Sequence, residues 1–173
     1  QADLQALIFE YALNRDGTTL SSFLSEADAE FVKAEVEKLG LRYRDLEPYR
    51  PWFASISMSV MQILNAGGDP EAGVDMILSG EARAEDKELR FFESGEEQIL
   101  FLAGMSDETA ATMLVEGLRQ TKENPDFFAT LVSTWQRGET EALAELLTES
   151  MAENAPELAE AWHRARTPTR GAA

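Results

Sequence analysis

The residues best suited to chemistry gather in one short stretch, LRFFESGEEQ, which begins at Leu89. An apolar run, Leu89 to Phe92, stops on the carboxylate of Glu93, and Gly95 and two more glutamates follow at once. A carboxylate placed at the end of a strand can serve as a general acid or base or as a metal ligand. The alternative is a solvated charge just before a helix, where the helix dipole favours an anion. The residues alone leave both interpretations open.

Glu97 and Gln98 follow at the start of a helix expected to begin near Glu96. Glu97 and Gln98 are neighbours in sequence, so they cannot share one face of that helix. We therefore expect Glu97 to be solvated and Gln98 to be the side chain that points toward Glu93. We also expect Glu93 to lie at the surface or to face an open crevice.

The composition excludes several other kinds of site. The chain has no cysteine, which excludes disulfides, Cys-ligated zinc, iron–sulfur clusters and thiol catalysis. Its single histidine, His163, cannot build a multi-histidine metal site within this sequence. We therefore expect no metal site in this chain alone and only weak binding of transition metals, because these favour nitrogen and sulfur ligands.

The charge of the chain is strongly acidic. The 173 residues include 32 acidic and 15 basic side chains, which gives a formal net charge of −17. Such a surface repels phosphate backbones, and no basic stripe with interleaved aromatic residues is present, so we expect no nucleic-acid partner. The same charge favours cations or basic partners. No apolar run approaches the roughly 20 residues of a membrane span, so none is expected.

The elements that must position these residues are expected to be mainly helices. Ser25 predicts a helix start, with Asp28 completing an approximate capping box, and Gly40 predicts the end of that helix. Residues 51–66 are ambiguous, because Ser55 to Val60 alternates like a strand while the apolar residues of the segment also line one helical face. The length of the pattern and Pro51 at its start favour a helix. Asp69 and Pro70 predict another start, and further helices are expected over residues 107–121, 126–136, 139–151 and 156–164.

One short strand is expected over residues 89–92, which are too few and too aromatic for a helix. A single strand cannot form a sheet, because its backbone donors and acceptors need a partner strand. The chain also begins without a methionine or a signal peptide, which indicates a part of a longer protein. We therefore predict a mainly α multi-helix array with one short strand, part of an incomplete α+β domain. The helical segment is expected over residues 1–166 and a disordered tail over residues 167–173.

Three further residues carry structural expectations. Apolar neighbours surround Asp75 in the sequence, so we expect it to be buried and hydrogen-bonded, holding its helix against the strand. Trp52 and Trp135 are expected to be core anchors rather than platforms for ligand stacking.

Several short motifs occur in order along the chain: DGTTL from Asp16, RPW from Arg50, GVD from Gly73, FE and EEQ from Phe92 to Gln98, and WQRGE from Trp135. Their order and spacing resemble the middle of the TraB/GumN family, to which the Tiki proteins also belong. The resemblance covers roughly residues 4–162 of the chain.

This resemblance implies a role for the stretch around Glu93. In such proteins the strand belongs to a small central sheet and delivers its glutamate to the edge of the active site. Glu93 matches that glutamate, and Gln98 matches a glutamine one turn into the next helix. Tiki members are regarded as metal-dependent proteases related to erythromycin-esterase-like enzymes. The resemblance thus implies a peptide or protein substrate, a divalent metal such as manganese or cobalt in the complete protein, and a bacterial, periplasmic or otherwise extracytoplasmic location.

The departures from that family pattern are equally informative. Family members carry two Gly-x-x-His motifs and an Arg-Asn pair after the last helix, and none of these occurs here; His163 is not in a Gly-x-x-His context. We therefore expect this chain to be the helical portion of such a hydrolase and to be inactive alone. The alternative function is a non-enzymatic, acidic helical interaction module that binds a basic or amphipathic partner in a groove between helices.

Overall fold

The structure is a computed structural model that describes residues 4–154, with side chains through residue 148. The described part of the chain is mainly helical, which confirms the predicted fold class. Its α-helices are α1 (Leu4–Ala12), α2 (Glu26–Lys38), α3 (Pro51–Asn65), α4 (Val74–Ala84), α5 (Gly95–Ala103), α6 (Asp107–Glu123), α7 (Phe127–Gln136) and α8 (Thr140–Asn154). Three short 3₁₀ helices are η1 (Leu20–Phe23), η2 (Tyr43–Asp45) and η3 (Pro70–Ala72).

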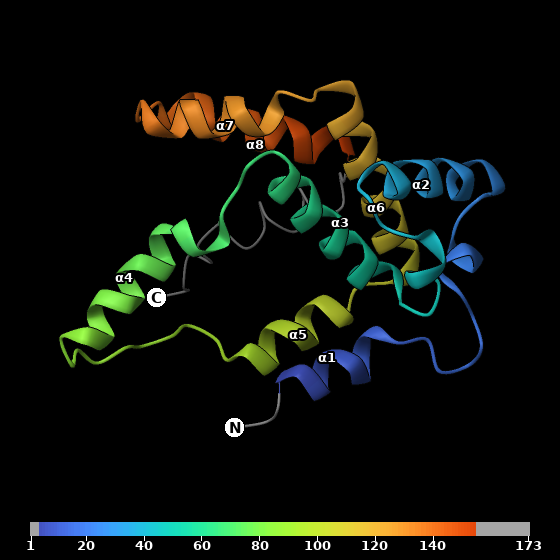
Figure 1. Cartoon of the computed structure of the whole chain (residues 1–173), viewed down its shortest axis with the longest axis horizontal. Coiled ribbons are helices and arrows are strands. Elements are labelled where there is room, and N and C mark those ends of the chain that lie inside the picture. The colour runs from blue at the N-terminus through green and yellow to red at the C-terminus, as the bar shows by residue number, and fades with distance from the viewer. Residues whose placement is uncertain (1–3, 155–173) are drawn as a thin grey trace, which may run out of the picture. The chain divides into compact units, whose positions relative to one another are not determined.

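The chain forms two compact units, residues 1–115 and residues 116–173. The predicted helix over 156–164, the tail over 167–173 and His163 all lie outside the described residues. In the first unit, α1 and α5 lie side by side (Figure 1). One cluster of its core is formed by Ala12, Trp52, Ala103 and Ala110, against which partly buried side chains such as Phe53 pack.

Local capping signals determine where the early helices begin and end. The hydroxyl of Ser25 accepts a hydrogen bond from the backbone N–H of Asp28 at 3.1 Å and donates one to its carboxylate at 2.7 Å. After α2, Gly40 adopts a φ of +79°, a left-handed conformation that glycine tolerates without strain. Pro51 is the first residue of α3, and the alternating residues Ser55 to Val60 lie within that helix. The helical interpretation of this segment is confirmed.

The strand expected over residues 89–92 is not formed. Residues 87–91 have no regular secondary structure, and Phe92 and Glu93 lie in a bend. Among the described residues, no backbone hydrogen bond links residues 88–93 to another segment. The physical reason is the absence of a partner strand beside the segment, since a strand is stabilised only by pairing. In the described part of the chain, strand-like pairing is limited to an isolated bridge between Leu13 and Tyr49.

Helix α4 begins later than the sequence predicts. Asp69 caps η3 instead, because its carboxylate accepts the N–H of Glu71 at 2.9 Å. None of the residues of α4 is buried, and its main neighbour among the described residues is η3. Figure 1 accordingly shows α4 apart from α3 and α5. Asp75 is therefore exposed, and the expectation that it is buried is wrong. Among the described residues, no neighbouring element buries this side chain.

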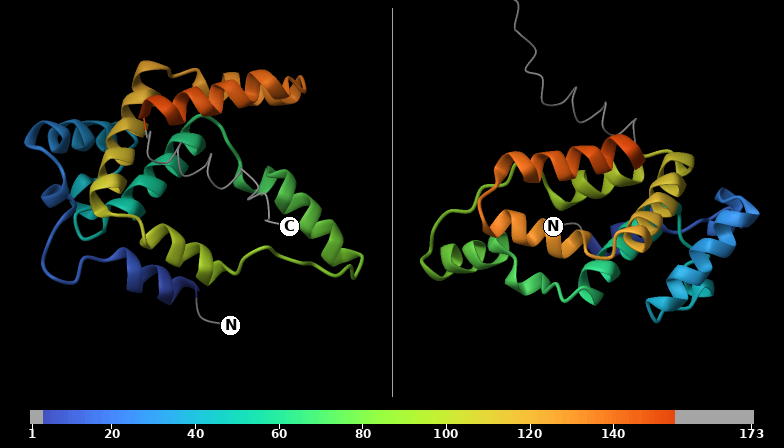
Figure 2. Two further views of the ribbon diagram at one scale, coloured as in Figure 1. Left: turned by 180° about the vertical axis from the view of Figure 1, so that it is seen from behind. Right: turned by 90° about the horizontal axis from the view of Figure 1, so that it is seen from above.

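In the second unit, α7 and α8 pack side by side (Figure 2). The turn between them carries a two-pronged ion pair, in which Arg137 Nε and Nη2 each donate to one carboxylate oxygen of Glu139 at 2.8 Å. Gly138 between them has a φ of +70°. Thr134 is the buried residue of α7, and its neighbour Trp135, about 100° further around the helix, is 56% exposed. The prediction that Trp135 is a core anchor is therefore wrong. The same prediction for Trp52 is confirmed, because Trp52 is only 4% exposed.

Candidate functional site

The candidate site is an open hollow of about 700 Å³ where the irregular segment before α5 meets the start of that helix. It is lined by Leu4 of α1, by the pair Phe91 and Phe92, and by residues 93–97. Both phenylalanine rings are largely exposed, at 73% for Phe91 and fully for Phe92. The hollow thus combines apolar walls with several carboxylates and has no basic side chain in its lining.

The start of α5 explains why one of these carboxylates is not free. Ser94 and Glu97 form a capping box: the Ser94 N–H donates to Glu97 Oε2 at 2.7 Å, and the Glu97 N–H donates to Ser94 Oγ at 3.1 Å. The hydrogen bond from the Ser94 backbone, with that from its hydroxyl, lowers the pKa of the Glu97 carboxyl. Glu97 is exposed, as expected, but its carboxylate is engaged in capping the helix.

Glu93 is the carboxylate that precedes this cap. It is exposed and lines the hollow, as the sequence predicts. Among the described residues, its side chain has no hydrogen-bond or ion-pair partner. The backbone N–H groups of Gly95 and Glu96 also have no acceptor there, as is usual for the first turn of a helix. A free carboxylate and two free backbone donors therefore lie within a few residues of each other.

Gln98 is less closely connected with the hollow. Its side chain is exposed and is not among the residues that line the hollow. In the described part of the chain, no hydrogen bond joins Gln98 to Glu93, so the pairing of the two remains a prediction. Gly95 lies against Leu4 of α1: a Cβ at this position would come within 2.8 Å of Cδ2, at the end of that flexible and partly exposed side chain.

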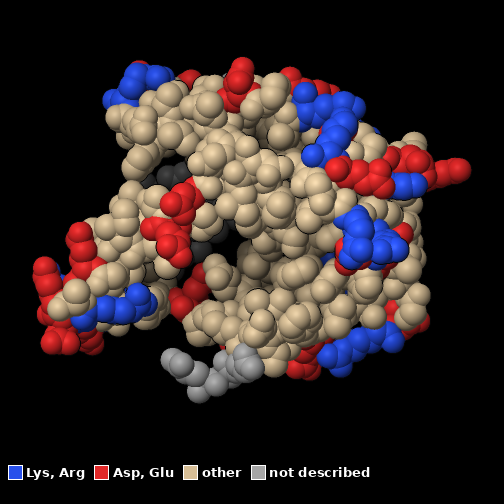
Figure 3. Space-filling model, viewed as in Figure 1, with Lys and Arg blue, Asp and Glu red and all other residues tan. Residues whose placement is uncertain are grey.

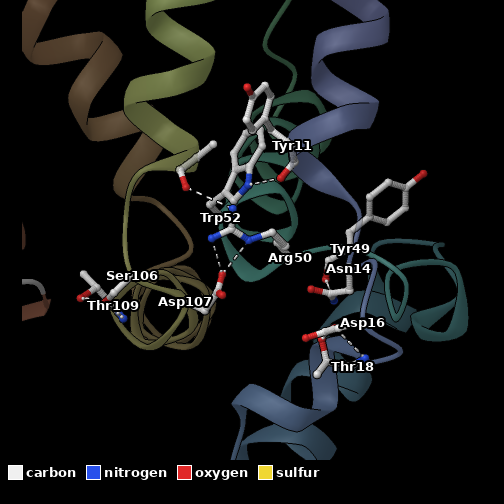
Figure 4. Close-up of polar contacts among 11 residues, drawn as sticks. Tyr11, Asn14, Asp16, Thr18, Tyr49, Arg50, Trp52, Ser106, Asp107 and Thr109 are labelled. Atoms are coloured by element: carbon white, nitrogen blue, oxygen red, sulfur yellow. Dashed lines mark hydrogen bonds and ion pairs between the residues drawn. The ribbon is translucent and has the colours of Figure 1, made fainter.

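The close-up in Figure 4 shows an ion pair that sequence analysis did not identify. Arg50, just before α3, reaches Asp107 Oδ1 through Nε and Nη2, each at 3.0 Å. Its Nη1 donates to the carbonyl of Ala103, the last residue of α5, at 3.1 Å. Both charged side chains are about three-quarters buried. Arg50 and Asp107 are 57 positions apart, so no local pattern connects them.

The same view explains two of the motifs that carry the family resemblance. In the motif from Arg50, the indole N–H of Trp52 donates to the carbonyl of Tyr11 at 3.1 Å, which fastens α3 to α1. In the motif from Asp16, the carboxylate accepts the hydroxyl of Thr18 at 2.6 Å and its N–H at 3.0 Å. These hydrogen bonds lower the pKa of Asp16. In the described part of the chain, the Asp16 motif therefore stabilises a local turn and the Trp52 motif a contact between two helices.

A second polar cluster joins η1 to η2. Ser21 Oγ donates to Glu47 Oε1 at 2.5 Å and lies 2.9 Å from the hydroxyl of Tyr43. Because Ser21 has one hydroxyl proton and gives it to the carboxylate, Tyr43 is the donor in the second bond. Burial raises the pKa of Tyr43, and the charges of Glu47 and Glu30 act in the same direction. Every polar atom here has a partner, which marks the cluster as structural.

The described residues do not by themselves form a metal site. Within residues 4–154, no three His, Cys, Asp or Glu side chains converge in a way that could hold an ion. In the hollow, Glu97 is engaged by Ser94, which leaves Glu93 and Glu96 as the available carboxylates. Protein sites for transition metals use three or four ligands, so a metal would need ligands beyond these.

Comparison with protein-family models finds a match to the TraB/PrgY/gumN family over residues 1–169. Neither the curated proteins nor the solved structures contain a match to this chain. Within residues 4–154, no helix combines the length and the apolar character that crossing a membrane requires.

Proposed function

The chain belongs to the TraB/PrgY/gumN family, and we propose that it is the helical portion of a peptide hydrolase in which Glu93 supplies a carboxylate to the active site. The observation that carries the proposal is the unpartnered carboxylate of Glu93 on the wall of a hollow that also contains Phe91 and Phe92. A hollow that combines an apolar wall with a free carboxylate is suited to binding a peptide. The aromatic rings would contact an apolar side chain of the substrate, and the carboxylate would act on its backbone.

The chemistry proposed for Glu93 is general base catalysis. Its carboxylate would accept a proton from water as the water oxygen bonds to the scissile carbonyl carbon, and would pass that proton to the leaving amine as the C–N bond breaks. The free N–H groups of Gly95 and Glu96 are donors of the kind that stabilise a developing oxyanion. Gln98, one turn into α5, would orient the substrate or the Glu93 carboxylate.

The remaining groups of the active site would come from residues beyond those described. The resemblance to Tiki proteins supports a divalent metal, manganese or cobalt, in the complete protein, and an extracytoplasmic location. The proposal therefore predicts a Gly-x-x-His motif in the encoded sequence before this chain and another in the sequence after it. Other domains there, or none, would favour the interaction module instead.

The decisive experiment is Glu93→Gln in the complete protein, with Glu96→Gln as the matched control on the same hollow. Hydrolysis of a peptide library in the presence of manganese or cobalt should fall by about a hundredfold or more in Glu93→Gln. The melting temperature should stay unchanged, because the side chain is exposed. Glu96→Gln should keep most of the activity.

Three outcomes would contradict the proposal. Full activity of Glu93→Gln would remove this residue from the catalytic site. Unfolding of the variant would show that Glu93 is structural. Equal losses in Glu93→Gln and Glu96→Gln would assign the effect to the general negative charge of the hollow.

A further inference from the structure

Helix α4 presents an apolar face that nothing in the described part of the chain covers. Val74, Ile77 and Leu78 are 50%, 48% and 58% exposed, and no residue of the helix is buried. The helix has 11 residues, and isolated helices shorter than about 12 to 15 residues are marginal in water. Helices of this length are normally stabilised by packing of an apolar face, so this face is suited to contact with another surface.

The exposed face of α4 carries apolar side chains and one carboxylate. Val74, Ile77, Leu78 and Glu81 occupy positions i, i+3, i+4 and i+7, so they lie on one side of α4. Glu81 continues the apolar stripe with a carboxylate, which is exposed and has no ion-pair partner among the described residues. Arg83 is about 200° around the helix from Glu81 and lies on the opposite side. The stripe therefore presents three apolar side chains and one free negative charge.

Around this stripe the other charged side chains balance one another, which leaves Glu81 as the charge on the apolar face. Figure 3 shows charged side chains gathered at the C-terminal end of α4. Residues 82–90 there hold three acidic and three basic side chains. Lys87 is paired with Glu85 at 2.5 Å and Arg90 with Glu88 at 3.1 Å, so these four charges are already engaged.

We propose that this face of α4 binds a basic amphipathic helix of a partner protein, with a Lys or Arg of that helix meeting Glu81. Charge complementarity selects this occupant. The apolar stripe of the partner would cover Val74, Ile77 and Leu78, and its cation would neutralise the carboxylate at the end of the stripe. A second copy of this chain fits less well, because it would add another net charge of −17 and no basic residue on this face. The proposal does not involve Glu93 and is independent of the proposed function.

The test uses the full chain and synthetic helical peptides of about 15 residues, the minimum for a marginally stable helix. One peptide carries a leucine stripe flanked by lysines, and its control carries glutamate at every lysine position. Calorimetric titration should show binding of the lysine peptide at least about tenfold tighter than that of the glutamate peptide. Added salt should weaken the binding, because exposed charge pairs are screened.

A charge swap tests the assignment to Glu81. Glu81→Lys should weaken binding of the lysine peptide by about tenfold and strengthen binding of the glutamate peptide. Arg83→Gln, on the opposite side of the same helix, should leave both affinities unchanged. Glu81 is exposed, so its replacement leaves the fold intact, and circular dichroism of the variant checks this. Ile77→Ser should weaken binding of the lysine peptide without reversing the charge preference.

Several results would overturn the proposal. Equal binding of the two peptides would show an apolar surface without selectivity for charge. An unchanged affinity in Glu81→Lys would place the binding elsewhere. Self-association of the chain in sedimentation experiments, abolished by Ile77→Ser, would assign the face to a second copy.

Discussion

At the scale of single residues, the first unit depends on polar side chains that join segments distant in sequence. Arg50 binds Asp107 at the start of α6 and the carbonyl of Ala103 at the end of α5, while its own N–H donates to Ala12 at 2.7 Å. The guanidinium group therefore joins the end of α5 to the start of α6, and the Arg50 backbone N–H joins the end of α1. Its planar set of donors suits this task in a way that a lysine ammonium does not.

Replacing Arg50 with alanine should lower the free energy of unfolding by about 2 kcal/mol, because hydrogen bonds to charged groups in a largely buried position are lost. Arg50→Lys should recover part of this loss. Urea denaturation measures both, and Arg42→Ala is the matched control. Arg42 pairs with Asp45 at the exposed surface, and this pair should contribute less than about 1 kcal/mol. Equal losses in Arg50→Ala and Arg42→Ala would contradict the structural role of Arg50.

Tyr43 gives a prediction about alkaline pH. Burial raises its pKa in the folded protein above the unfolded value of about 10. The unfolded chain therefore loses the phenolic proton first, and stability that is fully present below about pH 10 is lost as the pH rises toward the folded pKa. Tyr43→Phe should remove this part of the loss. Thermal melts between about pH 8 and pH 11 should show a smaller decline in the variant. An identical decline would mean that other groups control alkaline unfolding.

At the scale of elements, each helix start is determined by a few local hydrogen bonds. Ser25 and Asp28 begin α2, and Ser94 and Glu97 begin α5 through the same kind of reciprocal bonding. Such caps are encoded by residues three positions apart. They also make the start of α5, and with it the wall of the hollow, sensitive to acid.

The cap of α5 should weaken at low pH. The hydrogen bonds from Ser94 lower the pKa of Glu97 in the folded protein. This contribution to stability is present above the unfolded pKa of about 4.3 and is lost as the pH falls through the folded value. Glu97→Gln removes the titration but keeps an acceptor for the Ser94 N–H. Melts between about pH 7 and pH 3 should show the two proteins converging in stability at low pH. A constant difference would show that the cap is not charge-dependent.

At the scale of the whole molecule, the chain forms two units, and the described residues are mainly helical with an apolar face of α4 exposed. Circular dichroism should therefore show a helix-dominated spectrum. A strand content above about a quarter, the usual globular share, would contradict this. In the region 89–93 a strand can form only if a partner supplies the hydrogen bonds that the described residues do not.

The sequence by itself determined the helical character of the chain and several of its helix ends. Ser25, Gly40 and Pro51 act through bonds and backbone geometry within a few residues, so their effects could be predicted without knowledge of the fold. The position of Glu93 just before a capped helix could also be predicted from neighbouring residues. The charge of −17 and the absence of cysteine are likewise properties of the sequence alone.

Only the tertiary structure decided which faces are covered and which residues meet. Asp75 and Trp135 are exposed in the described part of the chain, although we predicted burial for both. The strand over residues 89–92 failed to form because pairing depends on a second segment. Arg50 and Asp107 meet across 57 positions because helix packing brings their backbones together. Burial and long-range pairing depend on neighbours in space, which the periodicity of one segment cannot specify.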